Sequence, residues 1–187
     1  MLPVSPLAPE RFPGLPPIEG ARIATAARGI RYKGRDDLLL MLFDPGTTVA
    51  GVFTRSLAPG APVDWCRKAL AAGGGKGRAF IVNSGNANAF TGRHGDEALR
   101  AVTAATAKAL DVPEARVFTS STGVIGEKLP HERITAKLAE LRDGLSSGAI
   151  EAAARAIMTT DTFAKGAGAT VEIDGQTPRA YPVRYLM

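Results

Sequence analysis

A mixed α/β (α+β) fold, with β-sheets flanked by helices, is predicted by three features of this sequence. Short apolar runs, such as residues 37–43 (DLLLMLF) and 79–83 (AFIVN), have the length and composition of buried strands. In other segments, residues spaced three or four positions apart would share one face of a helix. One such face comprises Leu99, Val102, Thr106 and Leu110. The 21 glycines and 13 prolines fall between these segments, as expected for strands and helices joined by tight turns. With 187 residues, 45% of them hydrophobic, the chain can form one domain with a core.

The first half of the chain is expected to contain several strands and one helix. A Pro-rich segment, residues 1–19, precedes a strand in which Ala21, Ile23 and Thr25 alternate. The turn Asp44-Pro45-Gly46 joins strand 37–43 to residues 48–54 (TVAGVFT), which predicts a hairpin. Residues 63–72 form a helix that ends at the glycines 73–75, and strand 79–83 follows.

The second half is expected to alternate helix and strand. Helix 96–110 leads to a strand that begins at residues 117–119, and two further helical faces follow, comprising Ile134, Leu138, Leu141 and Leu145, and then Ile150, Ala153 and Ile157. Residues 170–173 with Asp174-Gly175 resemble a strand entering a hairpin turn, but the tail, residues 176–187, has two prolines and little room for a return strand. We therefore expect a single domain, residues 1–187, whose sheet is incomplete at its C-terminal end.

Composition excludes several classes of protein. The net charge is +5, but the sequence has no basic run and only 6% aromatic residues to stack on bases, so we expect no nucleic acid partner. Cys66 is the only cysteine, which excludes an internal disulfide and suits the reducing cytoplasm. The N-terminal segment lacks a signal-peptide pattern, and no run is long enough to span a bilayer. His94 and His131 have no partners at metal-ligand spacing, so we expect no metal.

Two polar loops follow directly after buried strands, at residues 83–92 (NSGNANAFTG) and 119–126 (TSSTGVIG). In the second loop, the Thr122 hydroxyl and the unobstructed backbone N–H of Gly123 suit the stabilisation of an oxyanion. The same residues also fit a glycine turn in which the threonine hydroxyl caps a backbone group. The first loop contains three side-chain amides, those of Asn83, Asn86 and Asn88. We expect these amides to hold loops together by hydrogen bonds rather than to contact a ligand.

Three other segments contain residue types that are found at functional sites. Residues 158–162 (MTTDT) follow a helical face and fit a ligand site or an ordinary polar helix end equally well. The segment 73–77 (GGGKG) is not a P-loop, because it lacks the following Ser or Thr and precedes a strand. Cys66 lies in a short amphipathic helix, where a packed thiol is expected rather than a nucleophile.

In combination, residues 21–175 resemble the ornithine acetyltransferase family, also called glutamate N-acetyltransferase. The specific stretches are the two polar loops, in the form VNSGNANAFTG (82–92) and SSTGVIG (120–126), and the segment AIMTTDT (156–162) with Lys165. Further matches, in the same order and spacing, are GIRYKGRDDLL (29–39), VAGVFTR (49–55), APV (61–63) and Leu129-Pro130.

The resemblance implies an N-terminal-nucleophile-like acetyltransferase fold and transfer of acetyl from N-acetylornithine to glutamate, with some members also using acetyl-CoA. Family members cut their own precursor before a threonine, which becomes the nucleophile of a C-terminal β chain intertwined with the first piece in an α2β2 heterotetramer. No cofactor is implied. Thr122 and Gly123 match the family's oxyanion pair, and Thr159 matches a substrate-contacting threonine, with Thr160 the alternative if the register is shifted by one.

The sequence also departs from the family pattern. After residue 176 the family continues to K-G-x-G-M and P-N-M-A-T, which carry a substrate lysine and the nucleophile, and neither is present here. The stretch 165–168 (KGAG) comes too early to replace the first motif, and Phe90 stands where the family has cysteine. Three interpretations follow: an α-chain portion without the nucleophile, a non-catalytic binding module of the same fold, or a relative among the N-terminal-nucleophile hydrolases, such as an aminopeptidase. The MTTDT and SSTGVIG stretches favour the acetyltransferase.

Overall fold

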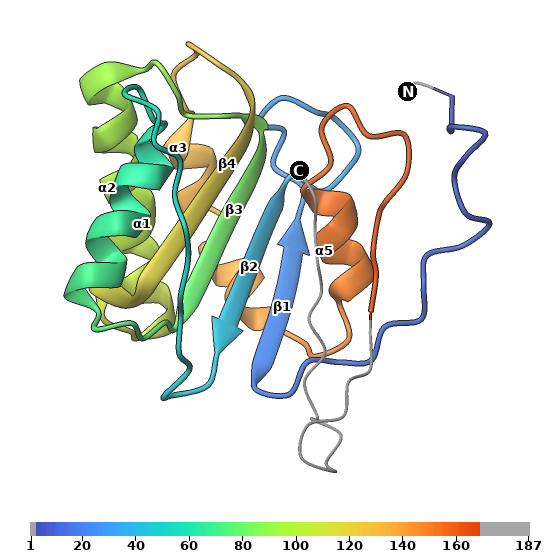
Figure 1. Ribbon diagram of the computed structural model, residues 1–187, viewed down its shortest axis with the longest axis horizontal. Helices are drawn as coiled ribbons and strands as arrows, with labels where there is room; N and C mark the ends of the chain where they lie inside the picture. The colour runs from blue at the N-terminus through green and yellow to red at the C-terminus, as the bar shows by residue number, and fades with distance from the viewer. Residues whose placement is uncertain (1–2, 169–187) are drawn as a thin grey trace.

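A four-stranded sheet with helices on both faces forms the centre of the molecule (Figure 1). The structure, a computed structural model, describes residues 3–168. The strand order is β1-β2-β3-β4, with bounds Ala21–Ala26, Leu38–Phe43, Ala79–Asn86 and Val117–Val124. The first three strands pair antiparallel, whereas β4 lies parallel to β3. The helices are α1 (Ala61–Ala72), α2 (Gly92–Leu110), α3 (His131–Thr135), α4 (Leu138–Asp143) and α5 (Ile150–Ala156), with a 3₁₀ turn η1 at Glu114–Arg116.

Apolar residues on both faces of β2 and β3 explain why helices cover both sides. Leu38 and Leu40 of β2 and Ile81 of β3 point to one face, where they pack against α2, α3 and α4. On the other face, alternate residues such as Leu39 and Val82 pack against α5 and the N-terminal segment. Successive residues of a strand point to opposite faces of the sheet, so each apolar run contributes side chains to two cores.

Most of the predicted elements are confirmed, with shifted ends. The helix expected over 63–72 is α1, which begins two residues earlier with Pro62 in its first turn, and the helix expected over 96–110 is α2. The helical face predicted from Ile134 to Leu145 belongs to two short helices, α3 and α4. Ile134 of α3 and Leu138 and Leu141 of α4 are buried in the same core. The strand expected over 170–173 and the tail 176–187 lie outside the described residues.

The prediction that residues 48–54 form a hairpin with the strand 37–43 is wrong. Within this segment only Thr48 makes a β-bridge, with Lys76, and residues 49–54 are not in a strand. The physical reason is that β2 already pairs with β1 along one edge and with β3 along the other, so no free edge of β2 remains for a return strand. The segment instead runs past the sheet towards α1, and Val49 and Phe53 pack near Cys66.

The carboxylate of Asp37 organises the connection between β1 and β2. It is fully buried and accepts the backbone N–H groups of Arg28 at 2.7 Å and Ile30 at 2.5 Å. Its backbone N–H donates to Ala26, and its carbonyl accepts the N–H of Ser84 at 2.9 Å. The buried Asp37 side chain therefore fixes the start of the connection 27–36, because a polar group in the interior is stable only where hydrogen bonds satisfy it.

Side chains of α1 cover the outer edge of β4. The indole N–H of Trp65 donates to the Val117 carbonyl at 2.8 Å, and the Cys66 thiol donates to the Thr119 carbonyl at 3.1 Å. Burial raises the pKa of the Cys66 thiol, partly offset by its hydrogen bonding with the Thr119 backbone. The expectation of a packed thiol is thus confirmed. At the opposite edge, Ile23 of β1 exchanges two backbone hydrogen bonds with Ser146.

Replacing Asp37 by Asn should destabilise the chain by about 2–3 kcal/mol, because the amide oxygen can accept only one of the two backbone N–H groups and the NH2 would face the other. Urea unfolding followed by the fluorescence of Trp65, the single tryptophan, measures this loss. Asp36→Asn is the control, since Asp36 is only half-buried and accepts one hydroxyl, that of Thr25. Equal losses in the two variants would contradict the role given to Asp37.

Candidate active site

The two polar stretches predicted as loops continue the strands β3 and β4. Ser84 pairs with Thr122 and Gly85 with Gly123 in the parallel register, and the ladder ends at Asn86 and Val124. The prediction of loops is therefore wrong for residues 84–86 and 120–124, whereas Asn83 and Thr119 lie in strands as the predictions 79–83 and 117–119 require. The reason is that each stretch provides the backbone hydrogen bonds that the other needs, so polar side chains do not end the pairing. Thr122 and Gly123 lie at the carboxyl end of β4.

Gly85 and Gly123 face each other at a separation that excludes any side chain. A Cβ on Gly123 would lie 2.3 Å from the Gly85 carbonyl carbon and 2.6 Å from the Asn86 nitrogen. Both glycines have positive φ angles, 99° at Gly85 and 133° at Gly123. Glycine is required at both positions by conformation and by space. The backbone at Gly123 is exposed to solvent, so its peptide can be approached from outside.

Three buried asparagines hold the loops around these strand ends. Asn83 accepts the Ser121 hydroxyl at 2.7 Å and donates to the Asn86 carbonyl at 2.8 Å. The amide of Asn86 donates to the Glu127 carbonyl at 3.0 Å and accepts the backbone N–H of Asn88 at 2.8 Å. Asn88 in turn donates to the Gly95 carbonyl at 3.1 Å. The prediction that these amides hold loops together is confirmed.

Thr122 is half-buried beside this network. Its hydroxyl makes no hydrogen bond to any residue between 3 and 168, whereas the alternative of a capping hydroxyl requires one. The neighbouring Ser121 hydroxyl is, in contrast, held by Asn83. Thr122 and Gly123 therefore lie at neighbouring positions of β4, and the structure gives the Thr122 hydroxyl no partner among residues 3–168.

Residues 158–162 lie at the same end of the sheet as Thr122. The hydroxyl of Ser84, which is the register partner of Thr122, donates to the Ala156 carbonyl at the end of α5 at 2.7 Å. Thr159 follows three residues later and is half-buried, whereas Thr160 is exposed. Sequence patterns gave no sign of this link, because the two residues are 72 positions apart. The structure thus brings the segment of Thr159 to the strand end of Thr122 and Gly123.

Asp161 closes the turn that contains Thr159. Its carboxylate accepts the Thr159 backbone N–H at 3.3 Å and pairs with Lys165. Partial burial opposes ionisation of Asp161, but the hydrogen bonds from Lys165 and Thr159 outweigh it, so the pKa of this carboxyl is lowered. The turn is therefore closed by an ionised carboxylate at neutral pH.

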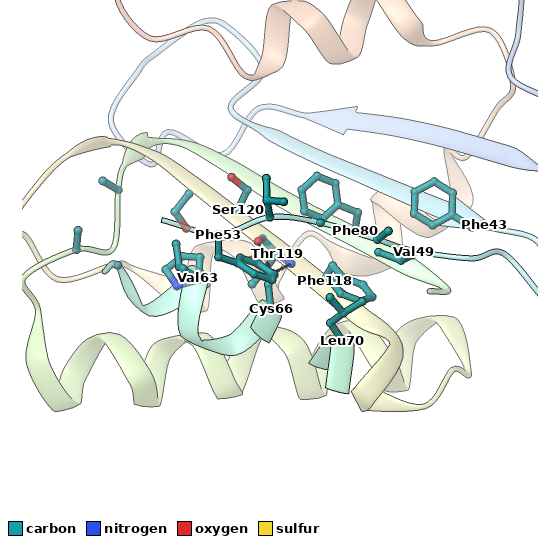
Figure 2. A pocket seen from close by; sticks show the side chains of 18 residues that line it. Phe43, Val49, Phe53, Val63, Cys66, Leu70, Phe80, Phe118, Thr119 and Ser120 are labelled. Carbon is teal, nitrogen blue, oxygen red and sulfur yellow. Dashed lines mark hydrogen bonds between the residues drawn. The ribbon is translucent and has the colours of Figure 1, made fainter. Parts of the chain in front are cut away.

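An apolar cavity of 670 Å³ lies along β4, where Phe118 and residues 119–121 line it. Figure 2 shows Phe53, Phe80 and Phe118 around it, with Thr119 and Ser120 of β4 among the lining residues. A second cavity, of 390 Å³, lies under α5 and shares Phe80 and Ser120 with the first. The two cavities together leave one face of the sheet incompletely covered.

Residues 3–168 contain no group of three or more His, Cys, Asp or Glu side chains that could hold a metal ion. His94 and His131 each lie near a single glutamate, Glu97 and Glu132 respectively. None of the helices formed by these residues has the length and apolarity needed to cross a membrane.

Known proteins resemble this chain in both sequence and structure. The family model described as "ArgJ family" matches residues 22–181. The arginine biosynthesis bifunctional protein ArgJ of Ruegeria pomeroyi is 58% identical over 173 residues, which are 92% of this chain and 42% of that protein. The protein of the same name from Gluconobacter oxydans is 54% identical over 178 residues, 95% of this chain and 41% of its own length.

Two solved structures share the fold. Arginine biosynthesis bifunctional protein ArgJ from Bacillus halodurans superposes with a TM-score of 0.80 at 32% identity, covering 89% of this chain and 85% of that one. Ornithine acetyltransferase from Mycobacterium tuberculosis, complexed with ornithine, gives a TM-score of 0.72 at 39% identity, covering 77% and 78%.

The structure is therefore a mixed α/β fold of the N-terminal-nucleophile type, the fold that it shares with these two solved proteins. More particularly, the chain belongs to the ArgJ family. It spans about 42% of the length of the ArgJ proteins that it matches.

Substitution of Gly123 by Ala should disrupt the paired ends of β3 and β4. Gly126→Ala is the matched control, because Gly126 also has a positive φ but has open space around its Cα. We expect the control to cost about 1–2 kcal/mol through backbone conformation alone, and Gly123→Ala to cost about 1–3 kcal/mol more through overlap with Gly85. Thermal unfolding of both variants measures the difference, and equal midpoints would contradict the close approach.

Proposed function

We propose that this chain is the α-chain portion of a glutamate N-acetyltransferase of arginine biosynthesis. The observation that carries the proposal is the position of Thr122 and Gly123, in a chain of the ArgJ family, at the same strand end as the segment of Thr159. The reaction transfers acetyl from N-acetylornithine to glutamate, with acetyl-CoA as a further donor in some enzymes of this kind. A relative solved with ornithine bound is consistent with the substrate class.

In the proposed mechanism, Thr122 and Gly123 form the oxyanion hole. The nucleophile is a threonine hydroxyl at the N-terminus of a second chain, and its own α-amine accepts the hydroxyl proton. Attack on the acetyl carbonyl of N-acetylornithine moves negative charge onto the carbonyl oxygen, which accepts hydrogen bonds from the Thr122 hydroxyl and the Gly123 N–H. The α-ammonium then returns the proton to the ornithine nitrogen, the C–N bond breaks, and ornithine leaves as a neutral amine while an acetyl-threonine ester remains.

The second half of the reaction uses the same hole. The amine of glutamate attacks the ester carbonyl, the oxyanion again forms beside Thr122 and Gly123, and N-acetylglutamate leaves as the threonine hydroxyl is restored. We assign Thr159 to contact with the substrate. Its half-buried position favours it over the exposed Thr160, which is the alternative in the neighbouring register.

A C-terminal chain cut from the same precursor supplies the nucleophile in this proposal. The solved relatives support a divided polypeptide, because this chain covers 85% and 78% of their chains but only about 42% of the full-length ArgJ proteins. The uncovered apolar face around Phe80 and Ser120 fits a surface that another layer of the protein completes. We place the assembly, an α2β2 heterotetramer, in the cytoplasm.

A non-catalytic binding module of the same fold is the second candidate. A module of this kind would bind a small ligand at the strand end without turning it over. It would also fold without a second chain.

The pure chain should therefore transfer no acetyl group, and adding the C-terminal part of the Ruegeria pomeroyi relative should produce activity. The oxyanion donors stabilise charge but supply no nucleophile. Release of ornithine from N-acetylornithine in the presence of glutamate measures turnover. Turnover by the pure chain would show that the chemistry is misplaced.

The same mixture should have a higher thermal midpoint and less self-association than the pure chain, because a partner that binds only the folded form stabilises it by mass action. Calorimetry and light scattering measure the two effects. A monomeric chain that melts sharply and ignores the added partner would favour the independent module.

In the active mixture, Thr122→Ala should lower kcat by roughly 10²–10³, as is typical when one oxyanion donor is lost. KM should change much less, because the donor acts on charge that develops only in the transition state. Ser120→Ala is a suitable control, since Ser120 lies two residues earlier on the same strand and lines the cavity rather than the proposed hole. An unchanged kcat in Thr122→Ala would return Thr122 to a structural role.

A further inference from the structure

Residues 27–36 form a bridge between the strand end of Gly85 and the segment that follows α5. The buried Asp37 carboxylate fixes the start of this connection through Arg28 and Ile30. Further along, the connection packs on Gly85: a Cβ at that glycine would lie 2.7 Å from the Arg31 Cβ and 3.4 Å from a ring carbon of Tyr32. The connection is thus held at its start by Asp37, and further along it packs on Gly85, the register partner of Gly123.

Arg35 extends from this bridge to the Thr159 segment. Its guanidinium lies 3.9 Å from the centre of the Tyr32 ring, which orients the planar group. One terminal nitrogen, Nη2, donates to the carbonyl of Met158, the residue before Thr159. The Nε atom is buried and has no partner among residues 3–168, so the guanidinium is directed by the stacking and by the Met158 carbonyl.

Two donors from different elements hold the carbonyls where α5 ends. Ser84 of β3 holds the Ala156 carbonyl, and Arg35 holds the Met158 carbonyl. Carbonyls at a helix end lack intrahelical partners, so these donors decide the path that the chain takes after the helix. On the peptide between Met158 and Thr159, Asp161 accepts the N–H at 3.3 Å and Arg35 donates to the carbonyl. Without Arg35 this peptide is held at its N–H alone.

We propose that Arg35 is a positioning residue that fixes residues 157–162 so that Thr159 faces the substrate. The inference rests on the proposed function. It gives Arg35 an indirect role in substrate binding, through the position of Thr159. Loss of the guanidinium releases the Met158 carbonyl while Ser84 and Asp37 keep the strands and the bridge in place. Lysine cannot replace it, because an ammonium lacks the planar group that stacks on Tyr32 while it donates.

The test compares Arg35→Ala and Arg35→Lys with Arg31→Ala in the complex of the full chain with the C-terminal part of the Ruegeria pomeroyi relative. Arg31 is an exposed arginine of the same bridge that pairs with Glu127 at 3.2 Å, and alanine keeps the Cβ that packs on Gly85. Amide hydrogen exchange at residues 157–162 should accelerate about tenfold or more in both Arg35 variants and stay unchanged in Arg31→Ala.

Kinetics supply the second measurement. Both Arg35 variants should raise KM for N-acetylornithine about tenfold with a smaller change in kcat, and millimolar guanidinium should restore KM in Arg35→Ala but not in Arg35→Lys, whose side chain occupies the space. Exchange at 157–162 as slow as in the unchanged chain, or an Arg35→Lys enzyme with unchanged KM, would overturn the proposal. An inactive complex of the unchanged chain would count against the proposed function instead, because hydrogen exchange measures the hold of Arg35 without turnover.

Discussion

The backbone contact between Gly85 and Gly123 is the constraint on which the site depends. It lets β3 and β4 stay paired through polar residues, up to Asn86 and Val124, where apolar packing no longer holds them together. The pairing places Ser84 beside Thr122, and Ser84 then holds the end of α5. Without the two glycines the strands would separate earlier. The ends of β3, β4 and α5, which are distant in sequence, would then lose the contacts that hold them together.

Local patterns in the sequence predicted the elements whose structure depends on their own residues. Apolar spacing identified α1 and α2, and the apolar run at 37–43 identified β2, since burial on both faces leaves a continuous hydrophobic stretch. The assignment of residues 48–54 as a strand failed because the fate of a strand-like segment is decided by whether an edge is free. Likewise, the polar ends of β3 and β4 looked like loops because their pairing depends on a partner more than 30 residues away.

The site shows the same division between local and distant information. The role of Asn83, Asn86 and Asn88 could be predicted because several amides close together in sequence tend to bond to their own loops. The proximity of residues 158–162 to the strand end depends on Ser84 and Arg35, whose partners lie 72 and 123 positions away. The oxyanion role of Thr122 and Gly123 and the substrate contact of Thr159 stay predictions, which come from local chemistry and family resemblance.

The coverage of the sheet edges limits how the molecule can be enlarged. At the start of β4, the indole of Trp65 and the thiol of Cys66 donate hydrogen bonds to backbone carbonyls with which an additional strand would have to pair. The backbone of Ser146 likewise pairs with Ile23 of β1. An extra strand would have to displace these groups before it could join. Stacking a further layer on the hollow around Phe80 meets no such obstacle. Insertions that thicken the protein should therefore be tolerated better in this architecture than insertions that widen its sheet.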